Sequence, residues 1–276
     1  TFAPTANLSA YGTYKLWIYS EVANDTINGN DTVGPYSIEH RQPVTAFPYI
    51  MSFDTPATTP GTGVPTNAGV TGTSDWERIP DPANGGFAFY VGKGKTPTAA
   101  TGPRNDYSGK GNYIYSEGNY GIAPISAIFA SKCLDLTGMT TPSIEFMYHM
   151  VGVDIGALAL QDVPANSNAW INIPGASITG AVQTASIDQW KYFKADLTTW
   201  AGQVIKIRFV AQKTGLGSAS DIAIDDIRVY NRIATDVGIL QINTPTQRVN
   251  MTVPIAPEFV IRNFGTASVT GVPITY

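Results

Sequence analysis

Hydrophobic residues in this chain alternate with polar residues over short stretches, and turn-forming residues separate these stretches. In Gly12–Ser20, for example, Tyr14, Leu16 and Ile18 occupy every second position. This spacing predicts one face of a β-strand. Gly, Pro, Asn and Asp interrupt the pattern at short intervals, as is typical of an all-β sandwich. No segment shows the spacing of a long amphipathic helix.

The pattern divides the chain into three segments. Residues 1–43 predict a hairpin, because Asn28-Gly29 is a turn signal and Val33–His40 returns as a second strand. Residues 44–232 form the main body. Its predicted strands are Phe87–Gly92, Asn112–Glu117, Ser126–Phe129, Ser143–Met150, Gly156–Gln161, Asn168–Ile173, Lys191–Asp196, Gln203–Ala211 and Asp221–Tyr230.

The last segment, residues 233–276, starts a new set of strands. The predicted strands are Thr235–Ile242, Glu258–Arg262 and Val269–Tyr276. The first segment resembles the closing strands of an Ig-like sandwich, and the last resembles the opening strands of another. Half a sandwich cannot cover its own apolar face, so we expect a piece of a longer modular chain. The alternative is that the two end segments pair with each other.

Composition excludes several classes of protein. Charged residues make up 14% and the net charge is −4, so nucleic-acid binding is not expected. No run of 18 apolar residues is present, which argues against direct membrane insertion. The start at Thr1 is that of a mature or truncated chain. Cys133 is the only cysteine and is predicted to be a small buried residue; a secreted animal module would usually have several cysteines.

Several short motifs in the main body resemble the MAM domain, a jelly-roll module of extracellular adhesion proteins. The motifs are Ser52–Asp54, Ser74–Arg78, Thr101–Ser108, Gly111–Glu117, Phe146–Gly152, Gly156–Leu158, Trp190 and Asp221–Val229. The resemblance implies an all-β fold: a jelly-roll β-sandwich flanked by incomplete Ig-like β-sandwich segments. Animal members carry paired cysteines and often Asp-His-Thr where this chain has Asp106-Tyr-Ser. These departures favour a bacterial version.

The flanking segments resemble Ig-like modules of large surface proteins in gliding, Bacteroidetes-type bacteria. The residues that carry this resemblance are Asn24–Thr32 and Val260–Gly265. It implies a secreted, cell-surface adhesin exported by a type IX system. Its expected partners are the secretion machinery, neighbouring Ig-like modules of the same chain, and a surface polysaccharide or protein ligand.

Acidic residues in the MAM-like segment are candidates for a structural Ca²⁺ site, with Na⁺ as an alternative. Ca²⁺ takes six to eight oxygen ligands, and the candidate carboxylates are Asp54, Asp75, Asp106, Asp225 and Asp226. The resemblance assigns metal ligation to Asp54 and to an acid on the last strand. The loop Gly61–Ser74 could add carbonyl oxygens and Asn67. The alternative is that the carboxylates accept N–H groups without an ion.

Alternation leaves open which acid of the last strand binds the ion. Asp225 and Asp226 are neighbours and therefore point to opposite faces of a regular strand. Because Ile227 and Val229 look buried, alternation predicts that Asp225 points inward with Ala223.

Enzyme chemistry is not expected. The chain has no His-Glu-x-x-His motif, P-loop or serine nucleophile elbow. Glu77, Glu117, Glu145 and Asp154 would serve a glycosidase only in principle. His149 lies in an apolar strand, which predicts a core histidine bonded to backbone.

Tyr107 and Tyr120 lie in predicted loops, where exposed rings could stack on a sugar. Thr26 and Thr32 follow aspartates in Asp-Thr-aliphatic triplets, which resemble acceptors for O-linked glycans in Bacteroidetes-type bacteria. The chain is thus predicted to be a non-catalytic adhesin module. The alternative is a passive spacer or an accessory region of a large secreted hydrolase.

Overall fold

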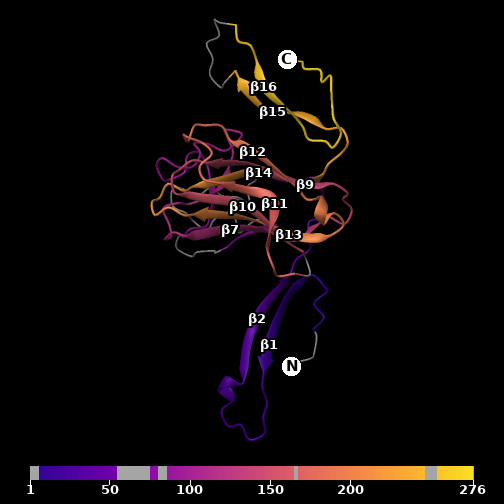
Figure 1. Cartoon of the computed structure of the whole chain (residues 1–276). Coiled ribbons are helices and arrows are strands. Elements are labelled where there is room, and N and C mark those ends of the chain that lie inside the picture. Colours follow the sequence, from indigo (N-terminus) through magenta and orange to yellow (C-terminus); the bar gives the residue numbers. More distant parts are fainter. Residues whose placement is uncertain (1–5, 55–74, 80–85, 165–166, 246–253, 276) are drawn as a thin grey trace.

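The computed structural model describes residues 6–54, 75–79, 86–164, 167–245 and 254–275. Two six-stranded antiparallel sheets pack face to face, and a two-stranded sheet lies at each end of this sandwich (Figure 1). The predicted fold class, an all-β jelly-roll sandwich, is confirmed. Within the described residues, no helix is long and apolar enough to cross a membrane.

The first large sheet, here the β13 sheet, has the strand order β11-β10-β13-β7-β4, and β8 pairs with β13. Its strands are β4 (Trp76–Ile79), β7 (Ile125–Ser131), β8 (Leu134–Asp135), β10 (Ile155–Pro164), β11 (Ile171–Thr179) and β13 (Val204–Lys213). A short 3₁₀ helix, η2 (Thr198–Trp200), leads into β13.

The second large sheet, here the β14 sheet, has the order β12-β9-β14-β6-β5, and β3 pairs with β14. Its strands are β3 (Tyr49–Met51), β5 (Phe89–Gly92), β6 (Tyr113–Ser116), β9 (Pro142–Met150), β12 (Lys191–Asp196) and β14 (Ile222–Asn231). All nine residues of β9 are buried, because apolar side chains cover it on both faces.

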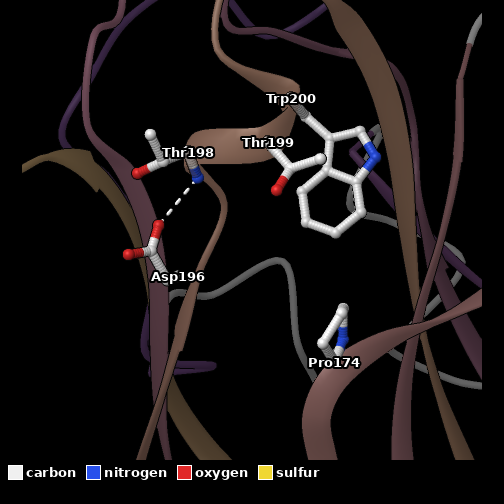
Figure 2. Close-up of a pocket in the computed structure, with 5 residues that line it drawn as sticks. All are labelled: Pro174, Asp196, Thr198, Thr199 and Trp200. Carbon is white, nitrogen blue, oxygen red and sulfur yellow. Dashed lines mark hydrogen bonds between the residues drawn. The ribbon is translucent and has the colours of Figure 1, made fainter.

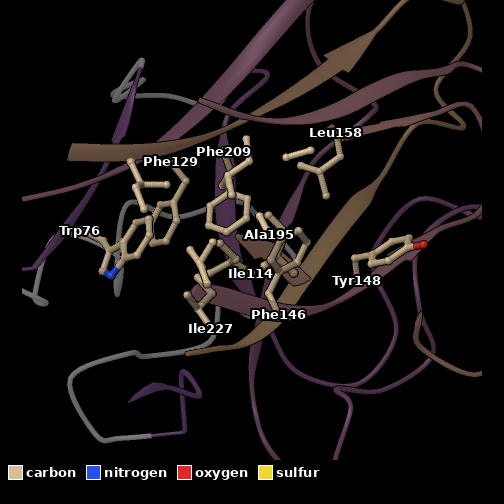
Figure 3. Close-up of a cluster of buried hydrophobic side chains, with 14 of the residues drawn as sticks. Trp76, Ile114, Phe129, Phe146, Tyr148, Leu158, Ala195, Phe209 and Ile227 are labelled. Carbon is tan, nitrogen blue, oxygen red and sulfur yellow. The ribbon is translucent and has the colours of Figure 1, made fainter. Parts of the chain in front are cut away.

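The main core lies between the two sheets (Figure 3). Phe129 of β7 is fully buried and stacks on Trp76, with ring centroids 4.9 Å apart. Phe209 of β13 meets Phe146 of β9 edge to face at 4.9 Å. Because each pair joins different strands, the aromatic residues fix the register of the sandwich as well as filling it.

The strand predictions for the main body are confirmed with ends shifted by at most three residues, except that the predicted strand Asn168–Ile173 overlaps β11 only over the first three residues of β11. The strands β3, β4 and β8 were not predicted, because each is short and its hydrophobic pattern is brief. The predicted strand Val269–Tyr276 is wrong over residues 269–275, which form no strand. Cys133 is only half-buried, so its predicted full burial is also wrong.

The two end segments form separate hairpins. β1 (Gly12–Tyr19) pairs with β2 (Thr32–His40), and β15 (Val237–Thr244) pairs with β16 (Glu258–Asn263). They project from opposite ends of the sandwich (Figure 1). The alternative that the end segments pair with each other is therefore wrong.

The tip of the first hairpin is a 3₁₀ turn, η1 (Asn28–Asn30), at the predicted Asn-Gly signal. A register shift between Leu16 and Ile18 breaks the predicted single face of β1. Apolar side chains are exposed along this hairpin, and Trp17 is 51% exposed. Thr26 and Thr32 are exposed as well, so both are accessible to modification, and their glycosylation stays a prediction.

Candidate functional site

The outer face of the β14 sheet carries a second cluster of buried aromatic and apolar residues. Its members are Ala88, Tyr90, Tyr113, Tyr115, Met147, Trp190 and Ala223. The indole N–H of Trp190 donates to the carbonyl of Asn105 at 3.0 Å. This bond holds the segment before β6 against the sheet, so the acidic residues nearby lie under a cover of protein.

A β-bulge interrupts β14 between Asp225 and Arg228. Asp226 has φ of 47°, in the left-handed region that an L-residue rarely adopts. Ile224 and Ile227 both belong to the main core, although strict alternation would place them on opposite faces. The prediction that Asp225 points inward with Ile227 is therefore wrong, because the extra residue of the bulge reverses the alternation.

Asp225 instead lies on the outer face of the β14 sheet and is 2% exposed. Its carboxylate accepts the backbone N–H of Tyr107 at 3.0 Å and the N–H of Asp226 at 2.8 Å. Burial, followed by the charge of Asp226, raises the pKa of Asp225 to about 9. Two N–H donors offset only part of the cost of burying this charge.

Asp226 shares this environment with two further acids. Burial and the charges of Asp54 and Asp106 raise the pKa of Asp226 to about 6. Asp54 accepts the backbone N–H of Asn112 at 2.7 Å. Neighbouring Gly111 lies so close that an added Cβ would overlap the Asp54 carboxylate, which explains the glycine. The structure therefore brings Asp54, Asp106, Asp225 and Asp226 into one acidic cluster.

Asp75, also predicted as a metal ligand, lies apart from this cluster. It precedes β4 of the other sheet and pairs with Lys132 at 2.6 Å. Among the residues that the structure describes, no three Asp, Glu, His or Cys side chains are close enough together to hold a metal ion. The loop 61–74, predicted to add ligands, falls outside the described residues.

Both tyrosines predicted to contact a ligand are half-buried and engaged in packing. The hydroxyl of Tyr107 donates to the carbonyl of Leu240 in β15 at 2.8 Å, which joins the jelly roll to the C-terminal hairpin. Tyr120 packs against the main core. Both residues were predicted to be exposed because they lie in predicted loops. In the structure, packing against neighbouring segments covers part of each ring.

A second buried polar cluster lies where β6 ends and β14 begins. Glu117 and Asp221 are 2% and 0% exposed, and the Gly118 N–H donates to Asp221 at 2.7 Å. Lys213 donates through Nζ to the carbonyl of Gly118 at 2.7 Å. Burial, then the charge of Glu117, raises the pKa of Asp221 to about 7, and Lys213 opposes this effect.

One hollow of about 400 Å³ is bordered by Pro174, Asp196, Thr198, Thr199 and Trp200 (Figure 2). Its carboxylate, Asp196, accepts the N–H of Thr198 at 2.7 Å and pairs with Arg232 at 2.8 Å. Glu145 is likewise occupied by the hydroxyls of Tyr192 and Tyr230, each at 2.8 Å. These carboxylates are thus engaged within the fold.

His149 is fully buried in β9, as predicted, but neither ring nitrogen has a hydrogen-bond partner of normal geometry among the described residues. A backbone bond of normal geometry is therefore not formed, although the backbone of Asp188 lies close enough to influence the ring. Trp190 packs against the ring, with centroids 5.7 Å apart. Burial lowers the pKa of His149 to about 4, and the backbone and charge of Asp188 only partly oppose this shift.

Acid is expected to weaken the fold through His149. Its pKa lies below the unfolded value, so its contribution is full above pH ~6.5 and is lost as the pH falls toward 4. His149→Phe keeps a ring beside Trp190 and removes the titrating group. Urea unfolding at pH 7 and pH 4 should show wild type losing up to about 3 kcal/mol relative to this variant. A constant difference between the two proteins would contradict the prediction.

The sequence comparisons agree with the jelly-roll fold of residues 75–232. A sequence profile of the MAM domain, meprin/A5/mu, matches residues 73–233, more than half of the chain. The two sheets and this match define a β-sandwich module of the extracellular type. The chain belongs to the MAM domain family.

Two curated relatives come from Xenopus laevis. Thyroid hormone-induced protein B is 30% identical over 159 residues, covering 52% of this chain and 20% of that protein. Neuropilin-1 is 30% identical over 139 residues, covering 49% of this chain and 14% of that protein. The chain thus matches a fifth or less of the length of these relatives.

Among solved structures, the chain is similar to the K1 cleaved adhesin domain of Lys-gingipain from Porphyromonas gingivalis W83. The TM-score is 0.41 and the identity 16%, over 67% of this chain and 98% of that domain.

Proposed function

We propose that this chain is a non-catalytic binding module of a secreted, cell-surface adhesin from a Bacteroidetes-type bacterium. The observation that carries the proposal is the MAM family match over residues 73–233. The MAM-like jelly roll, residues 44–232, would make contact with a surface polysaccharide or protein. Residues 1–43 and 233–276 would belong to Ig-like modules of the same chain, which a type IX system would export for attachment or gliding.

Several carboxylates of the jelly roll are engaged in hydrogen bonds or ion pairs within the fold, which supports a binding role. Both oxygens of Asp154 accept N–H groups, from Gly217 at 3.1 Å and Ala219 at 3.0 Å. Glu145 and Asp196 are similarly engaged. A glycosidase needs two carboxyl groups facing a bound sugar, whereas these three are used to hold loops and strands. Weak contacts repeated along a modular chain would gain strength through avidity.

A binding screen of the whole chain tests this proposal. The chain is immobilised and exposed to a panel of polysaccharides and protein-coated surfaces, with calcium and with EDTA. Saturable binding to any of these surfaces is the expected result. No binding in either condition would contradict the adhesin proposal and favour a passive spacer or an accessory region of a secreted hydrolase.

We also propose that the acidic cluster holds a structural Ca²⁺ or Na⁺ ion, with Asp54 and Asp226 as ligands and Asp106 and Asp225 beside them. Carboxylate oxygens are the ligands that hard cations prefer. Burial and then the charges of neighbouring carboxylates raise the pKa values of Asp225 and Asp226, and a bound cation would offset both effects. When bound, the ion would tie the segment before residue 55 to β14.

Chelation is expected to lower the melting temperature of the whole chain. At calcium concentrations near 100 times Kd, the ion would stabilise the fold by about 2.7 kcal/mol. Asp54→Ala and Asp226→Ala should each abolish the response to EDTA. Asp75→Ala is the matched control, since Asp75 pairs with Lys132, and it should keep the response. A wild-type melt unaffected by EDTA, after exhaustive dialysis, would contradict the Ca²⁺ site.

A further inference from the structure

The outer face of the β13 sheet carries a cross-strand row in which four of the five side chains are polar. The strand registers align Asn172 of β11, Gln161 of β10, Arg208 of β13, Ala130 of β7 and Glu77 of β4. With strands about 4.8 Å apart, such a row extends about 19 Å. It crosses the middle of the sheet, on the face opposite the aromatic core.

Arg208 is the centre of this row. Its guanidinium lies over the ring of Trp170, with Cζ 4.3 Å from the ring centroid. Nε donates to Oε1 of Gln161 at 2.7 Å, and Nε2 of Gln161 donates to Oδ1 of Asn172 at 2.8 Å. These contacts hold the guanidinium, the amides and the indole in a fixed arrangement before any ligand arrives.

The guanidinium has no carboxylate partner among the described residues. Its Nη groups make no hydrogen bond to that part of the chain, and the indole N–H of Trp170 likewise donates to none of it. Burial lowers the pKa of Arg208, so its charge is poorly solvated. Free Nη groups on a fixed guanidinium are suited to bidentate binding of a carboxylate.

The surrounding charges favour an anionic ligand. Lys206 lies two residues before Arg208 and therefore on the same face of β13. Glu77, at the other end of the row, is 3.7 Å from Arg41. This face thus presents two basic side chains, although the chain as a whole has a net charge of −4.

We propose that the row centred on Arg208 and Trp170 is a binding site for a polysaccharide that contains uronic acid. Arg208 would bind the sugar carboxylate, Gln161 and Asn172 would bind hydroxyl groups, and Trp170 would supply an apolar edge for the ring. A polysaccharide matches the row better than an acidic peptide, because the row offers planar amides beside a guanidinium that is stacked on an aromatic ring. The next row, Ala159, Val210 and Ile128, is apolar and offers no side chain that could bind the polar backbone of a peptide.

This inference rests on the proposed adhesin function and identifies the ligand class. Affinity electrophoresis of the whole chain in gels containing polygalacturonate is the test, with neutral galactan and poly-glutamate gels beside it. Wild type should be retarded by polygalacturonate more than by either other polymer. Arg208→Gln should weaken this binding at least tenfold, and Trp170→Ala should weaken it to a similar extent.

Arg228→Gln is the matched control. Arg228 also lies over an aromatic ring, that of Tyr230 at 4.5 Å, but on the β14 sheet. Its replacement changes the net charge by the same amount as Arg208→Gln and should leave binding unchanged. Equal losses in both variants would show non-specific charge attraction and overturn the site.

Four further results would overturn the proposal in distinguishable ways. Binding of polygalacturonate that survives Arg208→Gln would place the ligand elsewhere and leave the adhesin function standing. Retardation by poly-glutamate alone would indicate a protein ligand. Binding only to other surfaces in the earlier screen would contradict the uronate site but not the adhesin function. Absence of binding to any surface would contradict both the uronate site and the adhesin function. Circular dichroism of each variant establishes that it is folded.

Discussion

Replacing Phe129 with alanine is expected to lower the free energy of unfolding by about 3–5 kcal/mol, the range typical of a buried aromatic residue. Phe129 is fully buried in β7 and stacks on Trp76 at 4.9 Å. Its ring also lies 6.0 Å from Phe53 and 5.9 Å from Phe89. The loss therefore opens a cavity between the two sheets that neighbours on different strands cannot easily fill.

Urea unfolding, followed by tryptophan fluorescence, measures this loss. Tyr36→Ala is the control, because Tyr36 is a large aromatic residue that is exposed on β2, and it should change stability by less than about 0.5 kcal/mol. A Phe129→Ala protein within 1 kcal/mol of wild type would show that the core collapses around the site, contrary to the packing described in Figure 3.

Replacing Lys213 with methionine is expected to cost a similar amount, about 3–5 kcal/mol, because it removes one partner from a buried set of charges. Lys213 is the cation beside Glu117 and Asp221, and all three are buried. Without its ammonium group the carbonyl of Gly118 loses a donor. The two carboxylates then lose their nearest compensating charge.

The sign of the pH dependence follows from Asp221. Its folded-state pKa is raised to about 7, so the folded protein binds a proton that the unfolded chain has released. The stability this proton provides is present at low pH and is lost as the pH rises through 7. The deficit of Lys213→Met should therefore grow between pH 5 and pH 8.

Urea unfolding at both pH values checks the prediction. Lys191→Met, a change of the same kind on an exposed position of β12, should be nearly neutral. Adding Asp221→Asn to Lys213→Met should recover part of the loss, since one of the two charges is then removed. A deficit independent of pH and unchanged by Asp221→Asn would mean that lost packing of the lysine stem accounts for the effect.

The alternation of hydrophobic and polar residues predicted much of the fold, because buried strands leave a strong hydrophobic pattern in the sequence. The alternation in Ser143–Met150 and Lys191–Asp196 located β9 and β12 to within a residue. Short strands such as β3 and β4 were missed, since three or four residues hold too few repeats. Residues 269–275 have the alternating pattern without a strand, because a pattern alone supplies no partner for pairing.

The candidate sites were predicted less completely. Asp54, Asp225 and Asp226 were identified as a group from motif resemblance, and the structure brings their charges together with Asp106. Asp75 belonged to the same predicted acidic set and lies in the MAM-like motif Ser74–Arg78, but in the structure it pairs with Lys132 away from the cluster. The Arg208–Trp170 pair was not predicted, although Lys206 and Arg208 occupy the polar alternate positions of β13 and gave a weak signal of an exposed basic face.

The sequence by itself determined that this chain forms short β-strands and that its main body resembles MAM-type jelly rolls. These properties are local or carried by ordered motifs, so they can be read along one strand at a time. Tertiary structure alone decided the side of the sheet on which Asp225 lies, because a bulge at Asp226 reverses the alternation. The tertiary structure also decided that the rings of Tyr107 and Tyr120 are packed against the protein, and that the carboxylates of Asp54, Asp106 and Asp226 lie close together. Burial and pairing of this kind depend on segments far apart in the chain.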